Sequence, residues 1–380
     1  MSIFNQKYFF RIAEWWNSKI AMFFGWGFFF ALLTDLSFYN YLVVTVLLLL
    51  WYVTAASFGY FINDLYDVSS DAMAGKKNDT EGISPFYKNV IAVFLIFIQL
   101  CSFTTILVWS ESSMWWILIP LFNILLFVMY SHPSIRLKEK PYFDVVTDAL
   151  YAQILPLFVT FIAVAGKLEG QYVVLLFSIF IWSFIAGIRN IVEHQLIDFE
   201  FDKKSNIRNL IQLKGYKTGE SYLRSLKYIE LSLFIVFLIV AAFFQLFFSI
   251  AFLFVGMLIF MLLPLGENIL GQLAKYRNTQ TLVDFRVLYE SGIFMATAIA
   301  FSVTGSLYYS FVIPFQLLLF QNESLRLFAM FLWHRLILGV VYYKIINRIW
   351  ILFKIFVNYL IYYFRKYILF YDEKRARGEK

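Results

Sequence analysis

The chain has 380 residues, of which 61% are hydrophobic and 15% are charged, and its mean hydropathy is +0.71. Soluble domains carry roughly 45–50% apolar and about 25% charged residues, so this composition excludes a soluble globular protein, a disordered chain and a disulfide scaffold. It also excludes a soluble nucleic-acid binder despite the net charge of +7, and no nucleic-acid partner is expected. The single cysteine, Cys101, lies in an apolar run, and no small-residue cleavage site follows the basic N-terminal residues. The sequence therefore predicts an all-α, polytopic membrane protein.

Apolar runs of crossing length recur along the chain, since a bilayer core needs about 20 apolar residues per helix. They cover residues 20–34, 41–62, 89–109, 114–130, 143–165, 171–192, 228–265 and 291–313. The run at 228–265 is long enough for two crossings, with a break near Gln245–Ser249. Because the runs are continuous and do not alternate, they indicate helices and not a barrel. We therefore expect about nine transmembrane helices.

Basic residues are concentrated in every second loop. The loops near 67–88, 132–142, 198–227 and 266–289 carry them, whereas the intervening loops hold a single basic residue, Lys167. Because Lys and Arg are retained on the cytoplasmic side, we expect the N-terminus and the long loops to face the cytoplasm. The predicted location is the inner or plasma membrane of a bacterium.

The last part of the chain, residues 321–380, is predicted to be an extension of a transmembrane domain that covers residues 1–320. Eleven Lys and Arg follow residue 325, which favours a cytoplasmic end. A tenth crossing near 327–346 would bring the tail there, and an in-plane helix is the alternative. A basic stripe follows, which suits an interfacial helix on anionic lipids. The stripe contains Lys344, Arg348, Lys354 and Arg365.

A first acidic cluster follows the second apolar run. If the helix continues, Asp64, Asp67 and Asp71 stand at i, i+3 and i+7 on one face, and Asn63 extends that face. Carboxylates this close repel one another unless cations neutralise them. Hard oxygen ligands suit Mg²⁺, which binds through one or two carboxylates together with substrate phosphates.

A second acidic cluster follows the sixth apolar run. Asp198 and Asp202 share a helix face, and Asn190 and His194 continue the same row at intervals of four. Each cluster alone is also typical of a solvated helix end. However, the two clusters lie at similar depth and on the same side of the membrane. Together they predict two opposed rows of acids that hold Mg²⁺ ions and a diphosphate between them.

Three segments resemble signatures of the UbiA superfamily of intramembrane prenyltransferases. Asn63-Asp64-x-x-Asp67-x-x-x-Asp71 matches the first signature, Asp198 to Leu210 resembles the second, and Tyr130 to Lys138 resembles the family's Y-S-x-P-x-x-R-L-K segment. The resemblance implies nine helices around a lipid-open central cavity that holds Mg²⁺ and a prenyl diphosphate. The metal and diphosphate ligands that it implies are Asn63, Asp64, Asp67, Asp71, Asp198 and Asp202.

The same resemblance implies that Arg136 and Lys138 contact the diphosphate, with Lys203 and Lys204 as further candidates. The chain also departs from the family pattern. Many members carry Tyr and Lys where this chain has Asn190 and His194, and the usual glycine of the second signature is Asn206. We expect Asn190 and His194 to line the acceptor side of the cavity.

Three further charged residues allow either a functional or a structural interpretation. Asp144 and Asp148, at the start of the fifth apolar run, could deprotonate an acceptor, but their position favours caps at the positive end of a helix. Lys19, before the first run, could reach the phosphates, but we expect an interfacial anchor.

The predicted function is Mg²⁺-dependent transfer of an isoprenyl group from a prenyl diphosphate to a lipophilic, membrane-associated acceptor. The family resemblance implies that an aromatic acceptor is the commonest kind. Diphosphate is the other product. The resemblance also allows phosphoribosyl transfer to a polyprenyl phosphate, or terpene cyclisation. A cation-coupled transporter is the remote alternative, because the chain shows no clear internal repeat and its acids gather at one face.

Overall fold

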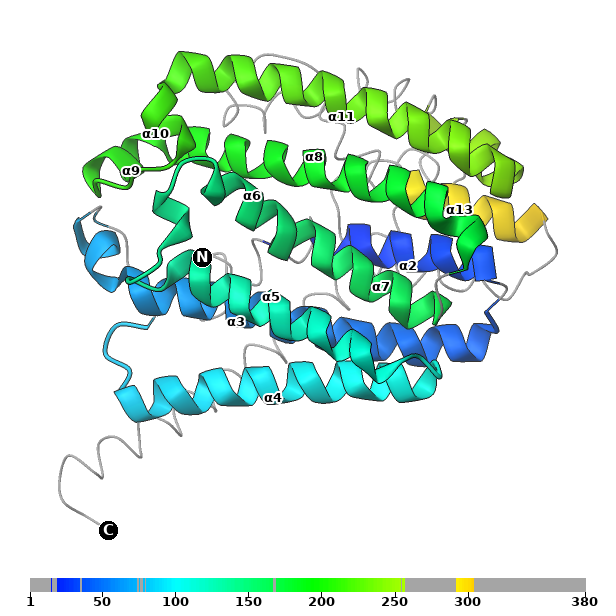
Figure 1. Ribbon diagram of the computed structural model, residues 1–380, viewed down its shortest axis with the longest axis horizontal. Coiled ribbons are helices and arrows are strands. Elements are labelled where there is room, and N and C mark those ends of the chain that lie inside the picture. The colour runs from blue at the N-terminus through cyan, green and yellow to red at the C-terminus, as the bar shows by residue number, and fades with distance from the viewer. Residues whose placement is uncertain are drawn as a thin grey trace, which may run out of the picture.

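The computed structural model describes residues 15, 19–34, 36–73, 75, 78, 80–166, 169–253, 255–256 and 292–303. All regular structure within these ranges is helical, and the long helices run side by side along one axis (Figure 1). Six of them are long and apolar enough to cross a membrane. The predicted all-α membrane bundle is thereby confirmed, and the described part of the chain contains six of the expected crossings together with shorter apolar helices.

The N-terminal half contains α2 (Ala21–Thr34), α3 (Phe38–Met73), α4 (Pro85–Trp109), η3 (Met114–Ile117), α5 (Leu118–Ser131) and η4 (Leu137–Glu139). The next crossing is one continuous helical stretch with three parts, α6 (Phe143–Ala149), the π-helical turn η5 (Leu150–Ile154) and α7 (Leu155–Ala165). The remaining elements are η6 (Gly170–Tyr172), α8 (Val173–Ile197), α9 (Phe199–Lys204), α10 (Leu210–Lys214), α11 (Tyr216–Phe244) and α13 (Ile293–Val303).

The helix ends differ from the apolar runs in ways that matter for the site. Helix α3 continues for 11 residues past the predicted run 41–62 and contains the whole first acidic cluster. Helix α11 begins well before residue 228 and ends at Phe244, and residue 245 interrupts the helix as predicted. The division at residue 320, the crossing near 327–346 and the basic stripe lie outside the described residues.

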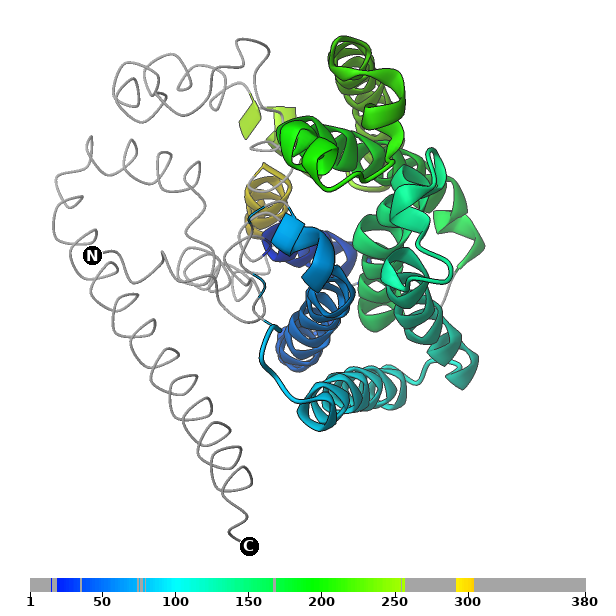
Figure 2. The ribbon, with the colours of Figure 1, turned by 90° about the vertical axis from the view of Figure 1, so that its left-hand side faces the viewer.

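The core is built around α2, in which 13 residues are buried. Trp26 of α2 packs against Trp182 of α8 and Phe237 of α11, with ring centroids 5.5 and 5.3 Å apart. In the end-on view α2 and α3 lie across from α6 and α7 (Figure 2). The pair α8 and α11 lies at one end of the bundle, and α4 lies at the opposite end. The walls of the bundle are thus held at fixed positions by aromatic packing.

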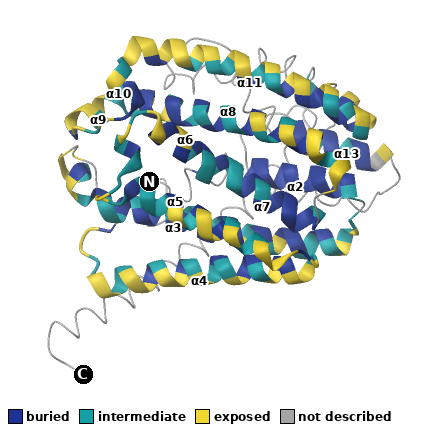
Figure 3. Cartoon of the chain, viewed as in Figure 1, coloured by how far each residue is buried: buried dark blue, intermediate teal, exposed yellow. Residues whose placement is uncertain are grey.

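The outer faces of α4 and α11 are exposed (Figure 3). They present large side chains such as Phe94 and Phe97 on α4, and Ile239 and Phe243 on α11. An apolar outer surface on helices of crossing length is typical of contact with lipid tails.

Candidate active site

A cavity of about 470 Å³ lies inside the bundle, between α3, α5, the α6–α7 stretch and α8. Its lining on α3 extends from Trp51 to Asp71, which corresponds to about 30 Å along the helix axis. Acidic and amide side chains line one end, and Phe23, Trp51, Tyr52 and other aromatic residues line the rest. A charged head and a long apolar tail therefore both find matching surroundings in the same cavity.

The first acidic cluster lies at the polar end because α3 stays helical as far as Met73. Asp64 and Asp67 are buried, and Asp71 is half-buried. The amide of Asn78 folds back on them: its Nδ2 donates to Asp71 Oδ2 at 2.8 Å and to the backbone carbonyl of Asp64 at 2.7 Å. The segment after α3 thus fixes the positions of these acids.

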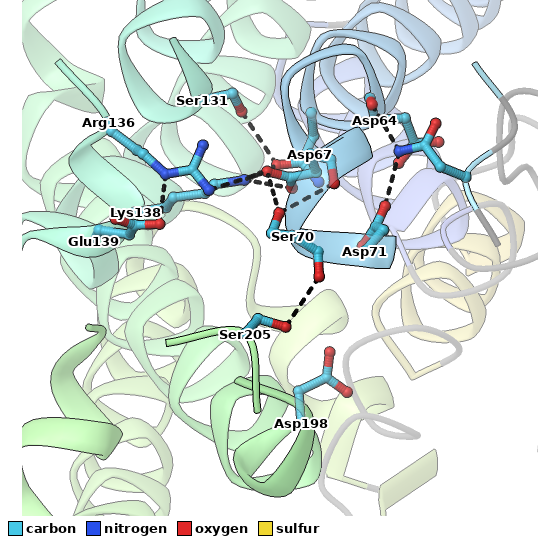
Figure 4. Close-up of polar contacts among 12 residues, drawn as sticks. Asp64, Asp67, Ser70, Asp71, Ser131, Arg136, Lys138, Glu139, Asp198 and Ser205 are labelled. Carbon is cyan, nitrogen blue, oxygen red and sulfur yellow. Dashed lines mark hydrogen bonds and ion pairs between the residues drawn. The ribbon is translucent and has the colours of Figure 1, made fainter. Parts of the chain in front are cut away.

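Two cations reach Asp67 from the turn between α5 and α6 (Figure 4). Lys138 Nζ donates to Asp67 Oδ1 at 2.5 Å and to Asn63 Oδ1 at 2.9 Å. Arg136 Nη2 lies 3.4 Å from Asp67 Oδ1, and its Nε donates to Glu139 at 2.5 Å. Burial lowers the pKa of Lys138 below its usual value, although the carboxylate of Asp67 opposes that shift. Lys138 and Asp67 therefore form a buried ion pair inside the cavity.

The second acidic cluster lies on the facing wall, where α8 ends at Ile197 and α9 begins at Phe199. The N–H of Asp202 still donates to the carbonyl of Asp198 at 2.9 Å, so the helical spacing survives the junction. The Asp198 carboxylate points toward the end of α3 (Figure 4). Ser205 Oγ donates to the carbonyl of Ser70 at 3.2 Å, which ties the two acidic segments together.

The donor set fits Mg²⁺ bound together with a diphosphate. The ammonium of Lys138 already lies where Asn63 and Asp67 converge, so this pair of oxygen ligands accepts a cation. Within the described residues no three His, Cys, Asp or Glu side chains form a preassembled metal cluster. Mg²⁺ usually takes one or two carboxylates from the protein and its remaining ligands from phosphate and water.

Most of the predicted site residues lie around this one cavity. The residues that line it are Asn63, Asp64, Asp67, Asp71, Lys138, Asn190, His194, Asp198 and Asp202. His194 is largely exposed, with its Nε2 3.9 Å from Asp198 Oδ2. Lys203 and Lys204 are exposed and lie outside the lining, with the ammonium of Lys204 over the Phe201 ring. Arg136 also lies outside it.

The two aspartates of α6 have different surroundings. Asp144 is fully buried, and its Oδ1 accepts from the N–H of Val145 at 2.9 Å. Its Oδ2 accepts from the N–H of Leu210 at 2.6 Å and from Gln195 at 2.9 Å, so it also joins α6 to α10 and α8. The expectation of a cap does not hold for Asp148, which lines the cavity and accepts from the Tyr151 hydroxyl. Lys19 lines the cavity as well.

A buried ion pair that the sequence motifs did not indicate joins α8 to α11. Arg189 donates to Glu230 through Nε at 2.7 Å and through Nη2 at 3.0 Å, and both residues are buried. Arg189 Nη1 also donates to Asn190 Oδ1 at 2.6 Å. The available signal was a charged residue inside an apolar run, because such charges are rare in membrane helices unless they are paired or functional.

Comparisons with known proteins agree with this architecture. The sequence model of the UbiA prenyltransferase family matches residues 20–269. A lycopene elongase/hydratase of Corynebacterium glutamicum is 26% identical over 161 residues, which cover 41% of this chain and 53% of that protein. The chain thus matches about half the length of this curated relative.

Solved structures of a UbiA homologue from Archaeoglobus fulgidus share the fold. The structure bound to DMAPP and Mg²⁺ has a TM-score of 0.53 at 18% identity and covers 79% of this chain and 98% of that chain. The structure bound to GPP and Mg²⁺ has a TM-score of 0.50, also at 18% identity, with 75% and 95% covered. At these identities the likeness establishes the helical fold.

Proposed function

The chain belongs to the UbiA prenyltransferase family, and we propose that it transfers an isoprenyl group from a prenyl diphosphate to a lipophilic acceptor in the membrane. The observation that carries this proposal is the cavity itself. One end is lined by carboxylates and the ammonium of Lys138, whereas the rest of the lining is largely aromatic and aliphatic, with a few polar side chains such as Asn123, Asp148 and Gln153. A diphosphate head and an isoprenyl tail match these two environments.

In this proposal Asn63, Asp64, Asp67 and Asp71, together with Asp198 and Asp202, would hold Mg²⁺ and with it the diphosphate. Bound Mg²⁺ neutralises the diphosphate and so makes it a better leaving group. Lys138 adds a fixed positive charge from the α5–α6 turn, and Arg136 keeps Asp67 in place from the same turn. A fixed positive charge near the departing oxygen would stabilise the charge that develops there.

The acceptor side of the proposed site is the wall formed by α8. Asn190 and His194 line the cavity there, about two turns and one turn before Asp198, respectively. The curated relative is a lycopene elongase/hydratase, so a polyene acceptor is proposed beside the aromatic acceptor expected from the family resemblance. The cavity holds the cleaving bond and the acceptor together, and such proximity contributes much of the rate.

The test uses the purified full chain in lipid vesicles with DMAPP or GPP, with lycopene or 4-hydroxybenzoate as acceptor. We expect acceptor-dependent release of diphosphate that requires Mg²⁺ and stops in EDTA, with the prenylated product identified by mass spectrometry. A cyclic hydrocarbon formed without acceptor would support terpene cyclisation instead. Absence of diphosphate release with every donor and acceptor would refute the proposed function.

The location proposed for the protein follows from the same features. We infer an integral protein of a bacterial inner or plasma membrane, with the acidic end of the cavity on the cytoplasmic side. The support is the charge of the loops at that end, where Arg136, Lys138 and Lys140 follow α5 and Lys203, Lys204 and Arg208 follow α8. Anionic lipids at the C-terminal stripe are part of this proposal.

A further inference from the structure

A carboxylate that belongs to neither acidic cluster also lines the cavity. Asp148 is carried by α6, on a wall that neither α3 nor α8 forms, and it is half-buried. Its Oδ1 accepts a hydrogen bond from the hydroxyl of Tyr151 at 2.5 Å. Since an ionisable group within a membrane-spanning helix is costly, its presence in the cavity calls for a function.

No cation among the described residues pairs with Asp148. No Lys, Arg or His lies within ion-pair distance of it in the described part of the chain, whereas Asp67 pairs with Lys138 and Glu193 with Arg189. Of these three acids, Asp148 is the one whose carboxylate has no cation beside it in the described part of the chain.

The local backbone and the neighbouring rings place this carboxylate beside an aromatic surface. Directly after Asp148 the helix widens into the π-helical turn Leu150–Ile154, and such turns are frequent at functional sites. Tyr151 lies in that turn, with ring centroids 4.5 Å from Phe127 and 5.2 Å from Tyr130. All three rings line the cavity, and aromatic faces stabilise a nearby positive charge.

The proposed reaction requires a proton acceptor. The C–O bond of the donor breaks and its electron pair leaves with the diphosphate. A π bond of the acceptor, either an aromatic ring or an alkene, then forms the new C–C bond and leaves a cation on the acceptor. That cation must lose a proton, whose C–H electron pair restores the π bond. This need is the same for both acceptor classes.

We propose that Asp148, held by Tyr151, is the base that removes this proton, an assignment that rests on the proposed prenyl transfer. The carboxylate takes the proton and becomes a carboxylic acid, and it returns the proton to water in the cavity when the product leaves. The rings of Phe127, Tyr130 and Tyr151 face the cation while it awaits deprotonation. Asp148 is thus a catalytic residue, and Tyr151 is a positioning residue.

The first test compares Asp148→Asn, Tyr151→Phe and Glu169→Gln in the vesicle assay, with GPP and whichever of lycopene or 4-hydroxybenzoate the unaltered chain prenylates. Glu169→Gln is the matched control, because Glu169 is exposed and lies beyond the other end of the same helical stretch. We expect Asp148→Asn to lower product formation by about 100-fold, the usual contribution of a general base. Diphosphate should still be released in a single turnover, and water-captured by-products should appear.

Tyr151→Phe should give a smaller loss and retain the product pattern, because the carboxylate remains. Equal rates and identical products for Asp148→Asn and Glu169→Gln would overturn the assignment while leaving the prenyl transfer intact. Failure of the unaltered chain to release diphosphate would refute the proposed function instead, so the two failures are distinguishable.

A second measurement depends on neither turnover nor a variant. Dicyclohexylcarbodiimide, which is apolar and reacts with carboxyl groups in their protonated form, should modify Asp148 in the unaltered chain at mildly acidic pH, and peptide mass spectrometry should locate the adduct. Geranyl S-thiolodiphosphate, a non-reacting analogue of GPP, should reduce that labelling to background, because its isoprenyl chain fills the cavity in front of Asp148. Equal labelling with and without the analogue would show that Asp148 does not face the donor, which would overturn the proposal.

Discussion

Asp67 is the residue at which the charges of the site converge. Lys138 and Arg136 both contact it, and Ser70 Oγ lies 3.4 Å from its carboxylate. Asp198 stands opposite on a different element, with its carboxylate directed toward the same space (Figure 4). Substitutions at Asp67 and at Asp198 therefore test the two halves of the proposed diphosphate site separately.

We expect Asp67→Asn and Asp198→Asn each to lower turnover by about 100-fold or more, since each removes a charge that the leaving group requires. Glu200→Gln is the control, because Glu200 is exposed on α9 and lies outside the cavity lining. Turnover is measured by diphosphate release, and folding by size-exclusion chromatography in detergent. Full activity of either aspartate variant would argue against the assignment of that acid.

Most of the charged residues that line the cavity could be predicted from the sequence. There is a physical reason why the others could not. The positions along the cavity of the acids on α3 and of those at the α8–α9 junction were predictable, because fixed helical spacing places each set on one face. Asp148 was not, since an acid near a helix start is most often a cap, and only tertiary packing shows which wall it lines. Arg189 and Glu230 are 41 residues apart in sequence, so no local spacing relates them.

At the scale of elements, α8 and α11 are joined by the buried pair of Arg189 and Glu230. We expect Arg189→Met and Glu230→Leu each to destabilise the bundle by about 3–5 kcal/mol, because each leaves the other charge buried without its partner. The double variant should recover most of the loss. Thermal unfolding in detergent measures all three.

Lys227→Met is the matched control for this pair. Lys227 also connects α11 to α8, but its ammonium lies 3.9 Å from Glu193 and both side chains are only half-buried. Its removal should cost no more than about 1 kcal/mol. Equal destabilisation by Lys227→Met and Arg189→Met would contradict the importance assigned to the buried pair.

Helix positions were predictable from apolar runs, but several helix ends were not. The run that ends near residue 62 understates α3, because its last turns are polar and face the cavity instead of lipid. The start of α11 was missed for a similar reason, since charged residues fill its first turns. Hydropathy reports where a helix meets lipid, whereas the helix itself ends where its backbone hydrogen bonds end.

At the scale of the whole molecule, the orientation in the membrane can be tested with two single-cysteine variants. Each is made in a chain in which Cys101 is replaced by alanine. Ser113 lies between α4 and η3, and Arg208 lies between α9 and α10 at the acidic end. Both residues are exposed. We expect an impermeant maleimide to label Ser113→Cys from outside intact bacterial cells and Arg208→Cys only after lysis, because basic loops stay inside. The opposite pattern would reverse the proposed orientation.

The length of α3 has a further consequence for energetics. Its 36 residues span about 54 Å, well beyond a hydrocarbon core of about 30 Å, and the acids occupy its last turns. In the proposed orientation the anionic head of the donor arrives and departs at one aqueous face, while only uncharged hydrocarbon moves into the lipid. No net charge then crosses the transmembrane voltage, where each elementary charge would exchange about 2.3 kcal/mol per 100 mV. The proposed reaction is therefore independent of the membrane potential and proceeds equally in an energised and a depolarised cell.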